Sequence, residues 1–242
     1  MLKKGGRYGN TEIKEILHDA LRYPSTSWKN VLILGIITVF SGLGGIAEDL
    51  HVQNFVLIGF LIIIGFLVGI LASGYLFRII KSSFAGSAEL PEFNSLSEMY
   101  LTGIKVFIIN IIYLIPSLLF VPGLLLHIGI LSFIAGLYIL IMIPVILMAL
   151  TNIVEHDDEF SAAFEFHEIL SKMGDIGWSN VIKWYIATGV LFLIIVFIGS
   201  MITMIISMVT SMIVGVLLIY LIIMPYLEMY FYRSAALFYM YE

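Results

Sequence analysis

The sequence contains no cysteine, which excludes disulfide bonds, thiolate metal sites and cysteine nucleophiles. Charged residues are also scarce, at 12% of the 242 residues, where a soluble domain has about 25%. The net charge of −5 argues against nucleic acid as a partner, because phosphate binding needs a basic surface. The P-loop, the dinucleotide fingerprint, the nucleophile elbow and the His-Glu-x-x-His motif are all missing. We therefore expect no enzymatic activity, no catalytic residues, no cofactor and no metal.

Apolar residues are abundant instead, at 61% of the chain with a mean hydropathy of +1.07. A chain this apolar cannot hide its surface in one soluble core, so the composition predicts an integral membrane protein. A bilayer core needs about 20 helical residues per crossing. The apolar runs predict six spans, at residues 31–47, 55–80, 105–126 and 128–150 and two within 181–232, which turn back near 207–211. No cleavable signal peptide is visible, so the first span is expected to act as an uncleaved anchor.

The basic residues give the six spans an orientation. With six spans, all 12 Lys and Arg residues fall on one side of the membrane, which should be the cytoplasmic side. Both termini are therefore predicted to be cytoplasmic, in a multi-pass protein of the cell membrane. Glu48, Asp49 and His51 form a charged outer connection, for which a hydrated turn is favoured over an ion-entry site.

An amphipathic stretch precedes each of the three predicted hairpins. In the first, Ile13, Ile16 and Leu17 begin an apolar stripe of helical period, which should lie at the cytoplasmic interface. In the second, which starts at Leu90, Ser95 and Glu98 fit a capping box. The third has a stripe made of Ala162, Phe166, Ile169, Leu170 and Met173.

Similar segments recur between these units. Trp28-Lys29-Asn30-Val31 opens the first span, and Trp178-Ser179-Asn180-Val181 opens the fifth. Offsets of about 75–81 residues favour three parallel repeats, approximately 10–82, 90–152 and 158–238. The predicted fold is an all-α six-helix membrane bundle in one domain, 1–242, whose repeats each combine an interfacial helix with a transmembrane hairpin.

Two motifs carry a resemblance to a known family. Gly74-Tyr75-x-x-Arg78 is followed by Leu90-Pro91-Glu92-Phe93, and Ala20-Leu21-Arg22-Tyr23-Pro24 precedes Trp28. In these motifs the chain resembles an uncharacterised family of archaeal and bacterial multi-pass membrane proteins, a domain of unknown function common in methanogens. The resemblance implies a prokaryotic, archaeal inner-membrane protein, and it implies no activity.

Few side chains are candidates for chemistry. The polar run 155–159 contains carboxylates and an imidazole that suit a divalent cation, although a solvated connector is the favoured interpretation. A functional role for Glu165, His167 and Glu168 is similarly the less favoured alternative. Glu228 lies in the sixth span, where a carboxylate needs a partner, a proton or water. Arg78 and Arg233 are its expected partners, with Arg78 preferred, and the three residues form the candidate intramembrane polar site.

Two functions follow as hypotheses. The first is a non-catalytic accessory protein that organises lipids or a partner protein. Its partners would be the bilayer, the anionic headgroups of the cytoplasmic face, attracted by Lys14, Arg22 and Lys29, and an unidentified protein. The alternative is a small-solute transporter or channel-like protein with a site near Glu228. Pro116, Pro144 and Pro225 lie within spans and could serve either helix packing or a transport path.

Overall fold

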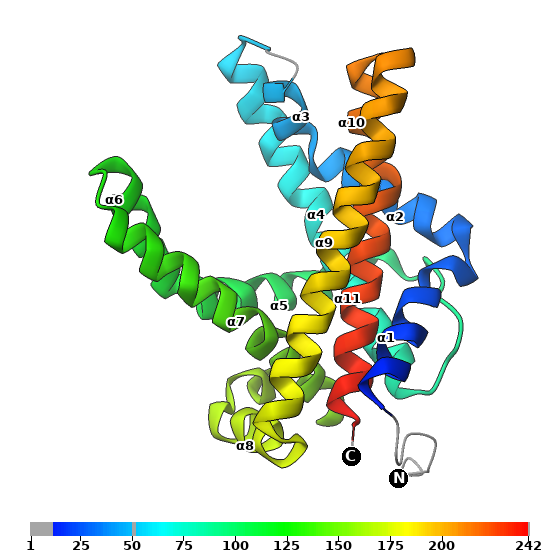
Figure 1. The fold of residues 1–242 in the computed structure, drawn as a ribbon, viewed down its shortest axis with the longest axis vertical. Helices are drawn as coiled ribbons and strands as arrows, with labels where there is room; N and C mark the ends of the chain where they lie inside the picture. Colours follow the sequence, from blue (N-terminus) through cyan, green and yellow to red (C-terminus); the bar gives the residue numbers. More distant parts are fainter. Residues whose placement is uncertain (1–11, 50–51, 242) are drawn as a thin grey trace.

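The computed structural model describes residues 12–49 and 52–241, and all regular structure in these ranges is helical. The start of the first predicted repeat and His51 lie outside the described residues. Three helical arms spread from a common base, where α1, α8 and the C-terminal end of α11 gather (Figure 1).

The arms are helical hairpins. The first arm contains α2 (Trp28–Ser41), α3 (Leu43–Asp49) and α4 (Phe55–Phe84). The second contains α5 (Leu96–Leu114), η2 (Ile115–Leu119), α6 (Phe120–Leu125) and α7 (Gly129–Glu155). The third contains α9 (Trp178–Val209), α10 (Met212–Leu218), the π-helical turn η4 (Ile219–Ile223) and α11 (Met224–Tyr239). The base adds α1 (Ile13–Arg22), η1 (Pro24–Thr26), η3 (Phe160–Phe164) and α8 (Phe166–Ile176).

Five helical segments are long and apolar enough to cross a membrane: Phe55–Phe84, Leu96–Leu125, Gly129–Glu155, Trp178–Val209 and Met212–Tyr239. The turn predicted between the last two is confirmed, because α9 ends at Val209 and α10 starts at Met212. The remaining predicted span, 31–47, is divided at Gly42 into α2 and α3, so neither part reaches spanning length alone.

The second amphipathic stretch is helical from Leu96 onwards, but the prediction of a separate helix in front of the second hairpin is wrong. Residues 90–95 lie outside any helix, and α5 runs without interruption from Leu96 into the apolar segment. Ser95 has a left-handed φ of 49°, and its side chain makes no capping hydrogen bond. The other two stretches form helices near the expected places. In α1, however, Ile16, Leu17 and Ala20 are buried against protein, and in the third stretch Phe166 and Leu170 are exposed.

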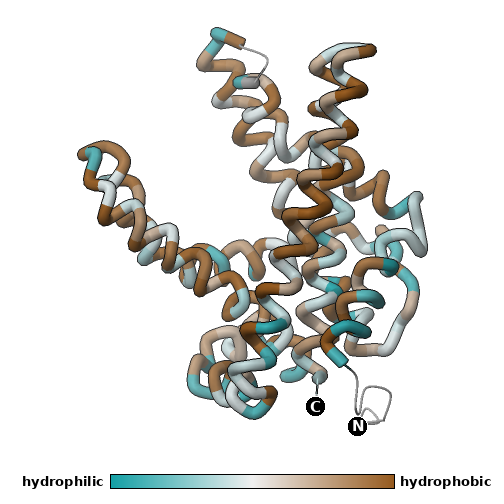
Figure 2. Tube along the Cα trace, viewed as in Figure 1, coloured by the Kyte–Doolittle hydropathy of each residue, from teal (hydrophilic) through white to brown (hydrophobic). Residues whose placement is uncertain are grey.

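The core lies in the base rather than along the arms. Buried residues are concentrated at the base end of each arm, for example from Ile146 to Ile153 in α7 and from Leu227 to Tyr239 in α11. Hydrophilic residues also gather there, while the arms are predominantly hydrophobic (Figure 2). Only 11–22% of the residues in the most apolar windows of the five spanning segments are buried. Most of the apolar surface of the arms therefore faces outwards.

Two glycines let α4 and α5 cross at backbone contact. A Cβ atom at Gly74 would lie 1.8 Å from the Met99 backbone oxygen, and one at Gly103 would lie 1.9 Å from the Ile70 oxygen. No real side chain tolerates such distances, so the contact between these two helices needs glycine on both sides. Small residues at helix crossings are the usual device of membrane proteins, where lipid removes the hydrophobic drive to pack.

Gly74→Ala should lower the free energy of unfolding by about 1–3 kcal/mol, because the two helices must separate to admit the methyl group. The matched control is Gly136→Ala in α7, where an added Cβ meets no atom within 4 Å. That control should be neutral or slightly stabilising. Thermal unfolding of the purified protein in detergent measures both variants, and equal shifts would contradict the packing account.

Candidate functional site

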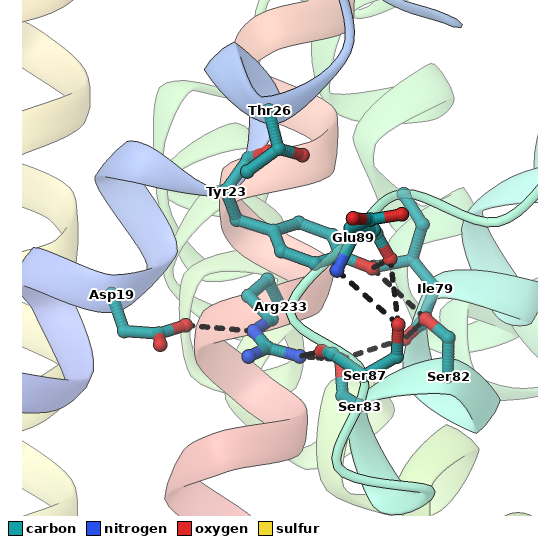
Figure 3. Close-up of polar contacts among 9 residues, drawn as sticks. All are labelled: Asp19, Tyr23, Thr26, Ile79, Ser82, Ser83, Ser87, Glu89 and Arg233. Atoms are coloured by element: carbon teal, nitrogen blue, oxygen red, sulfur yellow. Dashed lines mark hydrogen bonds and ion pairs between the residues drawn. The ribbon is translucent and has the colours of Figure 1, made fainter.

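Among the charged residues that the structure describes, the most completely buried one lies on α11. Arg233 is 2% exposed, and its Nε donates to Asp19 Oδ1 at 2.8 Å. Its Nη1 donates to Ser83 Oγ at 3.1 Å and to the Ser87 backbone oxygen at 2.9 Å (Figure 3). The guanidinium carbon lies 4.4 Å from the centre of the Tyr23 ring, a cation–π contact. One side chain thus joins α11 to α1, to the end of α4 and to the connection that follows it.

Tyr23 extends this network on the side of α1. Its hydroxyl lies 2.9 Å from Ser82 Oγ and donates to the Glu89 backbone oxygen at 3.0 Å. Burial raises the pKa of the Tyr23 phenol, against the opposing effects of the Ser82 hydrogen bond and the Arg233 charge. The phenol therefore stays neutral at physiological pH, so that it can donate a hydrogen bond while its ring faces the cation.

A polar cleft of about 680 Å³ lies beside the network. Asp19 and Tyr23 contribute to its wall, so the cleft shares two residues with the arginine network. Its lining consists of Glu12, Lys14, Glu15, His18, Asp19, Arg22, Tyr23, Ser25, Thr26 and Ala88. Charges of both signs in an open cleft suit a solvated ionic group rather than an apolar ligand.

The two halves of the Gly-Tyr-x-x-Arg and Leu-Pro-Glu-Phe motif contact each other. The Tyr75 hydroxyl donates to the Pro91 oxygen at 3.0 Å, and its ring stacks on Phe93 with centroids 3.7 Å apart. Arg78 Nη1 donates to the backbone oxygens of Glu92 at 3.1 Å and Asn94 at 2.9 Å. These contacts hold residues 91–94 against α4, which explains why this segment does not form the predicted helix.

The expected pairing of Glu228 is wrong. Arg78 is directed towards residues 92–94, and Arg233 pairs with Asp19, so the two arginines are engaged elsewhere. Arg233 lies five residues after Glu228, a spacing that places the two side chains about 140° apart around the helix. Among the described residues Glu228 forms no ion pair, and its buried Oε2 has no hydrogen-bond partner. The three candidate residues therefore belong to three different environments.

A second polar cluster lies between α7 and α8. His156 Nε2 is 3.2 Å from Glu168 Oε1, and Glu165 adds a second carboxylate. One potential ligand atom from each of these three residues lies within 4.8 Å of the others. The hydrogen bond to the Asn152 oxygen raises the pKa of His156, and the carboxylate of Glu168 acts in the same direction against the effect of burial. The neighbouring Glu168 raises the pKa of Glu165.

Sequence reasoning missed the partners of Arg233. From the sequence Asp19 received no role, and Tyr23 was used only as part of the family motif, whereas α1 and the residue that follows it carry these two side chains. A usable signal existed, since an arginine in an apolar terminal helix requires an acidic partner and α1 supplies one. The acceptor at Ser87 carries no such signal, because it is a backbone oxygen and any residue can supply one.

A family model described as a protein of unknown function, DUF4013, matches residues 57–204, which is more than half of the chain. The chain belongs to the DUF4013 family. The matched range contains Arg78 and the cluster of His156, Glu165 and Glu168, whereas Asp19 and Arg233 lie outside it. No curated protein and no solved structure matches the chain significantly.

Arg233→Met should lower the free energy of unfolding by about 2–4 kcal/mol. The substitution removes the buried cation together with its three hydrogen bonds. The carboxylate of Asp19 is half-exposed and stays hydrated without Arg233, which limits the loss of stability. Lys183→Met, at an exposed position of α9, is the matched control and should change stability by less than about 0.5 kcal/mol. Thermal unfolding in detergent distinguishes the two, and similar midpoints would argue against a structural role for the Arg233 network.

Proposed function

We propose that this DUF4013 protein is a non-catalytic membrane protein that organises lipids or a partner protein around its spread arms. The observation that carries the proposal is the burial pattern of the spanning segments. With only 11–22% of their apolar windows buried, these helices offer most of their surface to lipid or to another protein. A transport path, in contrast, needs polar groups facing one another within the spans.

The proposal includes six crossings in the cell membrane, with α2 and α3 together forming the first. The two helices cover residues 28–49, and a helix of this length would be about 33 Å long. Both termini are then cytoplasmic, and the base is the cytoplasmic end. The arms are the hairpins of three parallel repeats, and an archaeal origin remains the expectation from the family resemblance.

The base is proposed to contact anionic lipid headgroups. Lys14 and Arg22 line the cleft along α1, and both are exposed. Trp28 and Trp178 start α2 and α9 and are each 52% exposed, as expected for aromatic anchors at a membrane interface. Each basic residue near an anionic surface would contribute about 1 kcal/mol at most.

An apolar groove between the first arm and α5 supports a lipid role. It has a volume of about 430 Å³ and lies where α3 and α4 meet α5. The lining residues are Ser41, Gly44, Gly45, Ile62, Gly65, Phe66, Gly69, Ile70, Ser73 and Phe107. The four glycines of this lining carry no side chain, which leaves room beside Phe66 and Phe107 for a slender acyl chain.

The alternative function, a small-solute transporter, is favoured by one observation. The buried Oε2 of Glu228 has no hydrogen-bond partner among the described residues, and it follows the π-helical turn η4 and Pro225 in α11. Such helix irregularities occur often at functional sites. A proton or cation at Glu228 would satisfy this oxygen.

The topology can be tested directly, because the chain has no cysteine of its own. In intact cells a membrane-impermeant maleimide should label Gln53→Cys, in the connection before α4, and leave Glu159→Cys at the base unlabelled. Both positions are exposed in the structure, so both should react after the membrane is opened. Labelling of Glu159→Cys in intact cells would overturn the proposed orientation.

The organising role predicts contacts along the arms. A photo-crosslinking amino acid at Phe133 or Phe197, which are 67% and 66% exposed, should capture lipid or one recurring protein in cells. The same substitution at Phe77, which is 3% exposed, should give neither product.

The transporter alternative is tested in proteoliposomes made from the purified protein. A solute or proton flux that Glu228→Gln abolishes, with an unchanged thermal midpoint, would replace the organising role with transport. The organising role predicts no flux above that of empty vesicles for the wild type and for Glu228→Gln.

A further inference from the structure

The connection between α7 and α8 is fixed from the inside by buried polar side chains. Asn152 is 0% exposed, and its Nδ2 donates to the Ala162 oxygen at 3.0 Å. The buried Tyr113 hydroxyl donates to the Ala163 oxygen at 2.6 Å. These two bonds hold the return of the connection against α7 and α5. Glu165, two residues after Ala163, is therefore positioned by the fold relative to His156, at the start of the same connection.

The imidazole of His156 is held in one orientation. Its Nδ1 lies 3.0 Å from the Asn152 backbone oxygen, and because a carbonyl can only accept, Nδ1 carries the hydrogen. In the neutral ring this leaves the lone pair on Nε2, which faces Glu168 at 3.2 Å. Histidine ligands of metal ions are oriented in this way, with the far nitrogen bonded to a backbone oxygen.

Two carboxylates compete for that single nitrogen. A proton on Nε2 can form an ion pair with only one of the two carboxylates. The negative charge of the other carboxylate would then remain uncompensated. A cation bound between Glu165 and Glu168 would relieve the repulsion between their two carboxylates. The group is partly exposed, so that an ion in solution can reach it.

Other acids of the same connection are already engaged. Glu155 accepts a hydrogen bond from the Tyr239 hydroxyl, and Asp158 forms an ion pair with Lys81. Glu159 accepts from Ser161 Oγ at 2.7 Å. Of the polar run 155–159, considered from the sequence as a possible cation site, only His156 belongs to the cluster.

We propose that His156, Glu165 and Glu168 bind a divalent first-row transition-metal cation, such as Zn²⁺ or Mn²⁺, whose remaining positions are taken by water. One imidazole and two carboxylates suit such ions, whereas Ca²⁺ and Mg²⁺ prefer oxygen ligands alone. Ligand bonds of about 2.1 Å place neighbouring donor atoms about 3.4 Å apart in tetrahedral geometry. The three potential ligand atoms already lie within 4.8 Å of one another.

The test uses the full chain, purified in detergent without a polyhistidine tag and stripped with a chelator. Titration calorimetry with Zn²⁺ and with Mn²⁺ should show one saturable site per chain. His156→Gln and Glu165→Gln should each weaken the affinity by at least about tenfold. His167→Gln is the matched control, because His167 lies between the two glutamates in sequence and is outside the cluster.

Thermal unfolding supplies the second measurement. The metal should raise the midpoint of the wild type and of His167→Gln, but not that of Glu165→Gln, whose exposed side chain can be changed without disturbing the core. Absence of saturable binding in the wild type would overturn the proposal, and so would an equal loss of affinity in His167→Gln. The latter result would identify adventitious binding to surface histidines.

Discussion

The base of this protein depends on one buried cation. A guanidinium removed from water is costly unless its donors find acceptors, and Nε and Nη1 of Arg233 find them in Asp19, Ser83 and the Ser87 backbone. Because these acceptors come from different segments, the requirement also fixes how those segments meet. The N-terminal helix is held on the last helix, and the connection after α4 is folded back over it.

The arms follow a different rule from the base. In lipid a helix satisfies its own backbone groups, so it needs no neighbours to be stable. The arms can therefore spread apart while the polar residues gather at one end (Figure 2). Close contact between arms occurs where glycine allows it, as at Gly74 and Gly103, since lipid provides no hydrophobic drive for helix association.

The connections at the base show how local preference yields to tertiary contacts. Residues 91–94 form no helix in front of α5, because Tyr75 and Arg78 hold the backbone of this segment against α4. The connection after α7 is shaped in the same way by Asn152 and Tyr113. In both connections a side chain on a long helix donates a hydrogen bond to a backbone oxygen that would otherwise be satisfied within a helical turn. In the connection after α7, the resulting conformation brings His156 close to Glu165 and Glu168.

The sequence by itself determined the properties that depend on composition and on local period. The apolar runs predicted the membrane class, the helical content, the long apolar segments and the turn between α9 and α10. The tertiary structure alone decided which polar groups meet. The pairing of Arg233 with Asp19 joins residues 214 positions apart, and the oxygens of Pro91, Ala162 and Ser87 are backbone atoms. Every residue has a backbone oxygen, so the residue type does not indicate which of these oxygens accepts a side-chain hydrogen bond. The helical period gives the face on which a side chain lies, but not the neighbouring segment that it contacts. For that reason Glu228 could be recognised as an acid that needs a partner, while the partners assigned to it were wrong.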